Sequence, residues 1–420
     1  MGTRVRLLWQ PTDRSIDLPR GVTAAGTYEA FIPDLVASRQ FPLLGEVAAD
    51  VEDAAIAVRK LDATNQVLTR TESLARLLLR AESVASSRIE GLEISPQRLL
   101  RAAALTDDTK QRPTDHRAVA VLANIDAMAF AVDDPAEPIT LERILATHRL
   151  LLQNTDLAQY AGHVRTTQNW IGRSDYTPLN ADFIPPPPQR VPELLDDLVA
   201  FCTRTDLPAI AQAAIAHAQF ETIHAFIDGN GRVGRALIYM VLGHRGLTTR
   251  VLPPISLLLA TYSKEYVGCL MGVRESDDNN AWNQWISFFA TSCRRAVEQS
   301  VKFEATIAEI QTSWRTLLTN VRKNSSLEML LERLPEMPVL TVAGASRILK
   351  RSLPAANEAV NELVEAGILT AVKQGKRNRV FEARDLVDAF TKFERSLATP
   401  GGDTRNARPA RPVPSRPARA

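Results

Sequence analysis

The sequence PAIAQAAIAHAQFETIHAFIDGNGRVGR, residues 208–235, places a polar, glycine-rich run directly after an apolar helical one. Residues 210–223 and 233–244 each have the apolar pattern of a helix, so the polar run connects two predicted helices. A loop that only turns the chain needs one glycine, whereas this loop also carries a histidine, an acid, an amide and two arginines. The stretch therefore predicts a helix pair with a functional site at the turn between the helices.

Several groups in this loop suit an anion. Backbone N–H groups at a helix N-terminus have no helical partner, and the positive end of the helix dipole lies behind them. Gly229 and Gly231 would let a phosphate approach that backbone, because neither has a Cβ atom. Asn230 can donate its amide, and Arg232 and Arg235 offer planar guanidinium groups to phosphate oxygens from one side of the helix. These residues predict a phosphate site.

Two further side chains add chemistry to the phosphate site. Asp228 is an oxygen donor suited to Mg²⁺ shared with phosphates, and His224 is a residue type that can accept a proton from an incoming hydroxyl. Each group alone has an ordinary structural explanation as a turn residue, a core histidine or a surface arginine. Their conjunction in this order predicts a phosphate-transfer site.

Length and composition set the protein class. A chain of 420 residues, 45% hydrophobic and 23% charged, is expected to form two or three soluble globular domains. The net charge of +2 does not mark the whole chain as a nucleic-acid binder. The scattered Cys202, Cys269 and Cys293 form no CxxC pair, which argues against a disulfide framework or structural zinc and suits a reducing compartment. With no leader peptide and no long apolar run, we expect a cytoplasmic protein without membrane contact.

Helical periodicity dominates the chain before residue 324. Leu74, Leu77, Leu78 and Ala81, for example, recur on one helix face. Helices are predicted over residues 47–91, 116–132, 140–153, 191–203, 210–223, 233–244, 263–274 and 282–322. The interruption at residues 162–190 has extended pieces at 164–171 and 182–185, and its four consecutive prolines exclude a helix interior or a central strand. We expect a hairpin or loop there that covers another part of the fold.

The pattern changes after residue 324. A helix is followed by one that Thr341 caps and by a third, at about 354–365, that Ser352 caps. Two short β runs follow at 368–372 and 379–382, joined by the basic turn QGKRN. This order resembles a winged helix-turn-helix domain.

The loop HAFIDGNGRVGR resembles the H-x-F-x-D-G-N-G-R-x-x-R motif of the Fic family at every fixed position. Ala225 stands where that family often has proline, which affects the stiffness of the loop and not its chemistry. The resemblance extends to RTTQNWIG and FIPPPP as a β-hairpin flap, to SKEYVGCL and WNQW after the motif, and to the N-terminal YEAFIPDL. It implies a mainly α, Fic-type helical bundle with a small flap.

The resemblance implies an adenylyltransferase that moves AMP from ATP to a Ser, Thr or Tyr hydroxyl of a protein. By position, His224 would be the base, Asp228 would hold Mg²⁺ or Mn²⁺, and Phe226 would anchor the loop. The flap residues Asp182, Phe183, Ile184 and Pro185 would pin the target segment by strand-like pairing.

The nucleotide contacts that the resemblance implies divide by part of ATP. Asn230 and the backbone around it would stabilise the α-phosphate, the two arginines would hold the pyrophosphate, and residues after the motif would line the adenosine pocket. The full set comprises Gly229, Asn230, Gly231, Arg232, Val233, Gly234, Arg235, Tyr266 and Val267.

A second motif, SSRIEG, ends the first long helical region and places Glu90 in its last turn. A carboxylate there faces the negative end of the helix dipole, so a purely structural helix would favour Lys or Arg. Ser86, Glu90 and Gly91 match the inhibitory motif of the Fic family, [S/T]-x-x-x-E-[G/N]. The resemblance implies that Glu90 pairs with Arg235 and prevents productive binding of the γ-phosphate; the alternative is an ordinary surface glutamate.

Other functions remain open at this stage. The chain could be a transcription regulator whose Fic part senses nucleotide and whose winged helix binds DNA through Lys350, Arg351, Lys373, Lys376, Arg377 and Arg379. The winged helix could instead bind protein or form a homo-oligomer. A Fic relative could also remove AMP or transfer a different phosphate-containing group, although the intact DGNGRxxR favours AMP transfer from ATP.

These observations predict five regions. They are an N-terminal helical region, 1–112, with the inhibitory helix at about 72–91; a catalytic domain, 113–300; a connecting helix, 301–324; the winged helix, 325–396; and a disordered basic tail rich in proline and arginine, 397–420.

Overall fold

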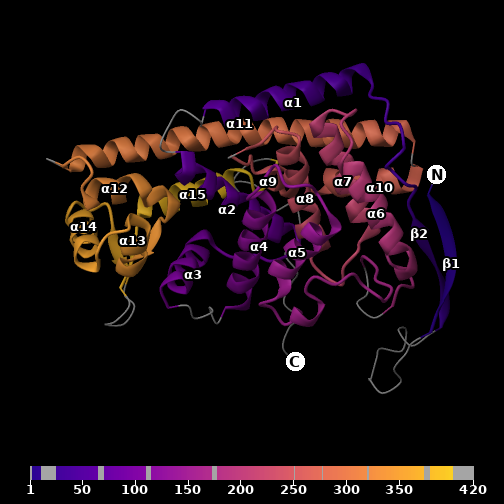
Figure 1. Cartoon of the computed structure of the whole chain (residues 1–420), viewed down its shortest axis with the longest axis horizontal. Helices are drawn as coiled ribbons and strands as arrows, with labels where there is room; N and C mark the ends of the chain where they lie inside the picture. The colour runs from indigo at the N-terminus through magenta and orange to yellow at the C-terminus, as the bar shows by residue number, and fades with distance from the viewer. Residues whose placement is uncertain are drawn as a thin grey trace. The chain divides into compact units, whose positions relative to one another are not determined.

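The computed structural model describes residues 2–10, 25–64, 71–109, 115–172, 177–249, 251–276, 278–318, 321–372 and 379–400. The predicted basic turn with Lys373, Lys376 and Arg377 lies outside these residues, as does the tail from residue 401. Within them the fold is mainly helical, as predicted (Figure 1). The chain divides into two compact units. Unit 1 comprises Met1–Ala55, Ala127–Leu247 and Glu265–Thr291, and unit 2 comprises Ile56–Asp126, Thr248–Lys264 and Ser292–Ala420.

Unit 1 holds the predicted loop. Its elements are β1 (Thr3–Trp9), β2 (Gly26–Ile32), the start of α1 (Gly45–Thr64), the end of α4 (His116–Val132), α5 (Leu141–Leu152), the short helices Ala158–Tyr160 and Pro188–Arg190, α6 (Val191–Cys202), α7 (Ala209–Ile223), α8 (Asn230–His244), most of α10 (Ser263–Ser276) and the start of α11 (Asn279–Leu317).

The helix α7 is buried from Ile210 to Ile223, and α8 packs closely against it. A Cβ atom on Gly234 of α8 would lie 2.7 Å from the carboxylate of Glu221 and 3.0 Å from the ring of Phe220. A larger residue at this crossing would therefore require the side chains of Glu221 and Phe220 to shift. The close packing fixes the two helix ends between which the loop runs.

Two elements of unit 1 were not predicted. The strands β1 and β2 form an antiparallel hairpin in which Arg4 is opposite Phe31 and Arg6 is opposite Glu29 (Figure 1). The ring of Trp9 meets that of Trp170 edge-on at 5.5 Å between centroids. The hairpin therefore packs against the segment that the sequence predicts as a flap.

Unit 2 contains the predicted inhibitory helix. Its elements are the rest of α1, α2 (Thr71–Ile89), α3 (Pro96–Thr109), the start of α4, α9 (Ile255–Thr261), most of α11, α12 (Ser326–Arg333), the short helix η3 (Leu334–Glu336), β3 (Val339–Thr341), α13 (Val342–Leu349), α14 (Leu353–Glu365), β4 (Thr370–Val372), β5 (Val380–Glu382) and α15 (Arg384–Ser396). The helical region predicted for 47–91 thus contains two helices, the second of which lies close to the predicted inhibitory helix at about 72–91. The elements α3, α9, β3 and α15 were missed.

The C-terminal elements follow the predicted order with one added strand. Thr341 and Ser352 are N-caps, as predicted: their hydroxyls accept hydrogen bonds from the N–H groups of Gly344 and Ala355. The added strand, β3, pairs with β5 in a three-stranded sheet of order β3-β5-β4. The order of elements agrees with a winged helix, and the domain assignment itself stays a prediction.

Candidate functional site

His224 follows directly on α7 and has a left-handed backbone, with φ 50° and ψ 58°. Its N–H still donates to the carbonyl of Phe220 at 3.0 Å, so it forms the C-cap of the helix. Histidine tolerates this conformation better than a β-branched residue would. The chain turns away here, and the imidazole is presented at the end of α7.

Two residues that sequence reasoning missed hold this turn in place. Arg165, 3% exposed, donates from Nε to the carbonyl of His224 at 2.8 Å and from a terminal nitrogen to that of Pro186 at 2.6 Å. Asn169 donates to the carbonyls of Phe226 at 2.9 Å and His224 at 3.3 Å. Burial lowers the pKa of Arg165 to about 10, so the guanidinium stays charged at neutral pH. Together they satisfy carbonyls that the end of α7 leaves unpaired.

His148 of α5 holds the other half of the loop and was also missed. Its Nδ1 accepts from the N–H of Gly162 at 3.0 Å, so that nitrogen carries no proton and Nε2 donates to the carbonyl of Asp228 at 3.0 Å. The His148 ring stacks on Phe226, with 3.7 Å between centroids and 6° between planes. Phe226 is fully buried, which confirms it as the anchor of the loop.

Gly229 and Asn230 begin α8, three residues earlier than predicted. Gly229 has φ +83°, and a Cβ atom on it would lie 2.7 Å from the side chain of Leu151. The amide of Asn230 accepts from the N–H of Phe226 and donates to its carbonyl, both at 2.8 Å. The primary contact of Asn230 is therefore with the loop backbone, and its second N–H proton is the one available to a phosphate.

Asp228 and Arg232 pair at the surface of the site. A terminal nitrogen of Arg232 lies 2.9 Å from Oδ2 of Asp228, and the two side chains are 4% and 48% exposed. Among the described residues, no cluster of three or more His, Cys, Asp or Glu side chains could hold a metal ion. One half-exposed carboxylate beside a phosphate site nevertheless fits Mg²⁺, which commonly takes one or two carboxylates together with substrate phosphates.

The other predicted nucleotide residues of α8 differ in their surroundings. Gly231, Val233 and Arg235 are buried, and Arg235 is 1% exposed. Gly234 faces α7, so it serves the packing of the two helices rather than a ligand.

The two predicted adenosine residues on α10 point to different surroundings. Tyr266 is 4% exposed, and its hydroxyl lies 2.8 Å from Nε2 of His217 on α7. Val267 is 49% exposed. The two residues therefore lie in different environments, and their place in an adenosine pocket stays a prediction.

The predicted flap pairs with the chain itself. Phe183 forms an antiparallel bridge with Ile171, and the carbonyl of Ile184 accepts from the N–H of Phe31 in β2 at 2.9 Å. Phe183, Ile184 and Pro185 are buried, whereas Asp182 is exposed. The β1–β2 hairpin therefore takes the Ile184 carbonyl, and strand-like pairing of a target segment with the flap stays a prediction.

Arg274 of α10 links the flap to the loop. Its guanidinium carbon lies 4.0 Å from the centroid of Phe183, and it donates to the carbonyl of Glu221 at 2.9 Å. Burial, with Arg274 and Arg165 adding to it, lowers the pKa of His224 to about 3; the Glu221 carbonyl and Asp228 oppose this. The imidazole of His224 is consequently neutral at physiological pH and able to accept a proton.

The SSRIEG motif ends α2 at Ile89, so Glu90 lies just beyond the last helical turn and not within it. The N–H of Leu92 donates to the carbonyl of Ser87 at 3.0 Å and that of Gly91 to Arg88 at 2.9 Å, with φ +80° at Gly91. These two bonds define a Schellman C-cap. Ser86 is buried and Glu90 is exposed. Glu90 and Arg235 belong to different units, so their pairing stays a prediction.

Comparison with known proteins assigns the loop to a family. Residues 138–242 match the family model described as Fic/DOC family, and residues 48–133 match the one described as Fic/DOC family N-terminal. The chain contains a Fic/DOC domain. The Fic/DOC region spans α5 to α8, the elements that carry His148, Arg165 and the loop.

Curated relatives match part of the chain. A Caenorhabditis elegans protein named protein adenylyltransferase fic-1 is 34% identical over 130 residues, which cover 31% of this chain and 23% of the relative. A probable protein adenylyltransferase of Aquifex aeolicus is 41% identical over 76 residues, covering 18% of this chain and 24% of the relative. The chain thus matches about a quarter of the length of these relatives.

A solved structure extends the likeness in fold. The crystal structure of a Fic family protein from Desulfovibrio desulfuricans covers 82% of this chain and 97% of its own, with a TM-score of 0.52 and 18% identity. At this identity the likeness concerns the fold alone, and it agrees with the predicted Fic-type helical architecture. No helix in the described part of the chain is long and apolar enough to cross a membrane.

Proposed function

We propose that this protein transfers AMP from ATP to a Ser, Thr or Tyr hydroxyl of a protein. The observation that carries the proposal is the neutral imidazole of His224, fixed at the end of α7 and followed, four residues on, by the Asp228–Arg232 pair at the start of α8. The names of the curated relatives support it.

The residues of the loop divide the work between them. His224 would take the proton of the target hydroxyl as its oxygen attacks the α-phosphorus of ATP, and the bond from that phosphorus to the bridging oxygen of pyrophosphate would break. The N–H groups at the start of α8 and the second amide proton of Asn230 would stabilise charge on the α-phosphate. Arg232, released from Asp228, would hold the pyrophosphate.

Asp228 would hold Mg²⁺ or Mn²⁺ together with phosphate oxygens. The metal would supply neutralisation of the charge that develops on the leaving pyrophosphate. The half-exposed Asp228 carboxylate could exchange Arg232 for the metal, and the pyrophosphate would then replace Asp228 as the partner of the buried Arg232 guanidinium.

The target segment would bind beside the flap. A cavity of about 500 Å³ lies between one face of the β1–β2 hairpin, the segment 178–184 and α10. Arg4, Arg6 and Glu29 line the hairpin side, and Arg274 lies on the α10 side next to Phe183. Since Arg274 also contacts the last turn of α7, a segment in this cavity would lie beside the base. The hairpin thus adds a second wall to the predicted docking flap.

Inhibition by Glu90 forms part of the proposal. The Schellman cap fixes the backbone of Glu90 at the end of α2 and leaves its side chain exposed, and Arg235 is the arginine that the motif assigns to it. A Glu90–Arg235 pair would keep Arg235 from the γ-phosphate.

Intact-mass analysis with ATP, Mg²⁺ and a cell lysate tests the reaction. An AMP adduct on this protein or on a lysate protein, absent with the His224→Ala variant, is the expected result. An adduct of a different nucleotide or of phosphate alone would assign another Fic-type transfer, and loss of AMP from a modified protein would assign the reverse reaction.

The DNA-binding alternative is less well supported by the structure. The helix α14, second of the helix-turn-helix pair, exposes Glu358, Glu362 and Glu365, and its sequence Leu353–Glu365 contains no Lys or Arg. Acidic side chains on this face would be repelled by DNA phosphates. The basic Lys350 and Arg351 lie before the helix, so we favour a protein contact for the predicted winged helix. Salt-dependent binding of duplex DNA by residues 325–396 would instead support the DNA-binding alternative.

A further inference from the structure

The C-terminal elements of unit 2 hold the inhibitory helix by a buried carboxylate near its start. Glu336 of η3 is 3% exposed; its Oε1 accepts from the hydroxyl of Ser73 at 3.0 Å, and Oε2 lies 3.7 Å from Nε of Arg76. The carbonyl of the same residue accepts from Arg80. Three successive turns of α2 thus bond to one residue of the C-terminal module, which we define as residues 326–396.

A second buried carboxylate of the C-terminal module contacts the other end of α2. Arg88, within the SSRIEG motif, donates to Oε2 of Glu394 on α15 at 3.2 Å, and Glu394 is 3% exposed. Burial raises the pKa of Glu394 to about 7, and Arg88 opposes that rise. Arg88 precedes Glu90 by two residues, so this contact lies at the base of the inhibitory turn.

The helix that follows the motif is held in the same way. Gln97 and Arg101 of α3 bond to the carboxylate of Glu382 in β5. An apolar cluster joins the same elements and comprises Leu100 and Ala104 of α3 with Val339, Val380 and Val387. The C-terminal module therefore contacts the chain on both sides of the SSRIEG turn.

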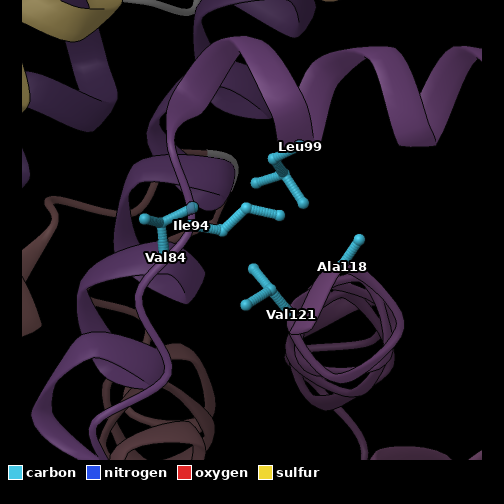
Figure 2. Close-up of a cluster of buried hydrophobic side chains, with 5 residues drawn as sticks. All are labelled: Val84, Ile94, Leu99, Ala118 and Val121. Carbon is cyan, nitrogen blue, oxygen red and sulfur yellow. The ribbon is translucent and has the colours of Figure 1, made fainter. Parts of the chain in front are cut away.

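The rest of α2 is fixed independently of the C-terminal module. Glu82, fully buried, accepts from the N–H and hydroxyl of Ser256 at the start of α9, and Asn124 donates to the carbonyl of Ser83 at 2.9 Å. Figure 2 shows Val84, Ile94, Leu99, Ala118 and Val121 pointing toward one another around the segment after the motif. These contacts let α2 stay folded when a single contact to the module is removed.

We infer that the C-terminal module is a clamp on the inhibitory helix and sets how strongly Glu90 restrains the active site. Moving α2 away from the module would take Arg88 from the buried Glu394 and would leave Glu336 with Arg333 of α12 but without Ser73 and Arg76, which is unfavourable. A ligand or partner that alters the packing of α15 would therefore displace Arg88 and, through it, Glu90. Such coupling is reciprocal, so the state of the active site would also affect binding at the module. The effect on activity rests on the proposed AMP transfer.

The test removes one contact of the clamp in the full-length chain. Glu394→Gln keeps the size of the side chain and removes its charge. Labelling with ATP carrying a labelled α-phosphate should rise by at least about fivefold, the lower range of such couplings. In a Glu90→Gly background Glu394→Gln should leave labelling unchanged, because the restraint that Glu90 places on the active site is already lost. Glu332→Gln is the matched control, since it removes an exposed 3.1 Å pair that Glu332 of the same module makes with Arg315 of α11, away from α2.

A second measurement separates the clamp from the proposed function. Amide hydrogen exchange of residues 80–91 should accelerate in Glu394→Gln and equally in Arg88→Gln, which removes the contact from the α2 side, and should not change in Glu332→Gln. If Glu90→Gly raises labelling but Glu394→Gln raises neither labelling nor exchange, the clamp is refuted. If Glu394→Gln raises labelling equally in the wild-type and the Glu90→Gly background, the clamp is refuted too. If Glu90→Gly itself has no effect, the inhibitory function fails and hydrogen exchange alone decides on the clamp.

Discussion

Burial sets the protonation state of His224. An unperturbed histidine titrates near neutrality, the value expected from sequence, but burial and the neighbouring guanidinium groups lower the pKa of His224 to about 3. The neutral form is then present throughout the physiological range. Its low proton affinity makes it a weaker base, so its effect in the proposed reaction would depend on fixed placement of the imidazole, through the bonds of Arg165 and Asn169 to the His224 carbonyl, as well as on proton affinity.

Replacing His224 tests this assignment. His224→Ala should lower AMP transfer by roughly 10²–10⁴-fold, because a positioned general base contributes about that much. Binding of ATP should persist, since the arginines and the start of α8 are unchanged; isothermal calorimetry would measure it. His116→Ala, an exposed histidine on α4, is the control and should retain full activity. A His224→Ala enzyme with more than about a tenth of the wild-type rate would contradict a role as base.

Asp228 gives a prediction about the metal. Asp228→Asn should lower transfer on the order of 10²-fold, as expected when one electrostatic group at the reacting centre is lost, and should raise the Mg²⁺ concentration needed for half-maximal rate. Asp206→Asn is a matched control because it removes a similar Arg–Asp pair, at 2.6 Å with Arg204, elsewhere in unit 1. Full activity in excess chelator would show that Asp228 serves the turn alone.

The site residues that lie on one continuous loop could be predicted from the sequence, whereas those on other elements could not. The loop is continuous in the chain, so its base, carboxylate and arginines were predicted together. Its supports come from remote positions: Arg165 and Asn169 lie 59 and 55 residues from His224, and His148 lies 80 residues from Asp228. Nothing in the local pattern reports such contacts, because each depends on how α5, the flap and α7 pack. A histidine on an apolar helix face is the signal that could have suggested His148.

Secondary structure was predictable where periodicity was long and failed where elements were short or paired with distant segments. The helix α4 has the predicted limits, His116–Val132. The hairpin partners β1 and β2 were missed because neither strand shows clear alternation of apolar and polar residues. The end of α2 was placed two residues too late, at 91 rather than Ile89, since the Schellman cap makes Glu90 the cap residue and Gly91 the residue after it.

The end of α2 gives a prediction at this scale. Glu90→Gly should raise AMP transfer about 5–150-fold, because loss of a pair worth ~1–3 kcal/mol frees Arg235 for the γ-phosphate. The double variant Glu90→Gly with Arg235→Ala should lose most of that gain. Glu93→Gly, an exposed glutamate three residues on, is the control. Labelling by Glu90→Gly no greater than wild type would reject the inhibitory role of the motif.

Across unit 1, several imidazoles are buried in neutral form. His148 and His217 are fully buried, and burial lowers their pKa values to about 4 and about 3. His224, whose pKa burial lowers to about 3, is the third such group, and in the unfolded chain all three titrate near 6.5. Below that pH the unfolded state takes up protons that the folded state cannot bind. The free energy of unfolding therefore has its full value above pH 6.5 and decreases as pH falls toward 4.

The free energy of unfolding of unit 1 should therefore fall steeply in mild acid. Each group contributes about 1.4 kcal/mol per pH unit below 6.5, so the three should together lower the free energy of unfolding by roughly 3–4 kcal/mol per unit between pH 6 and 5. Urea unfolding followed by tryptophan fluorescence would measure it, because Trp285 lies 6.0 Å from His217 between ring centroids. His217→Gln should reduce the slope by about a third, since one of the three titrating groups is gone, while His163→Gln, an exposed histidine, should leave the slope unchanged. A stability that is flat from pH 7 to 5 would mean that these imidazoles take up protons in the folded protein, and the neutral tautomer that His148 needs to hold the loop at Asp228 would then fail in mild acid.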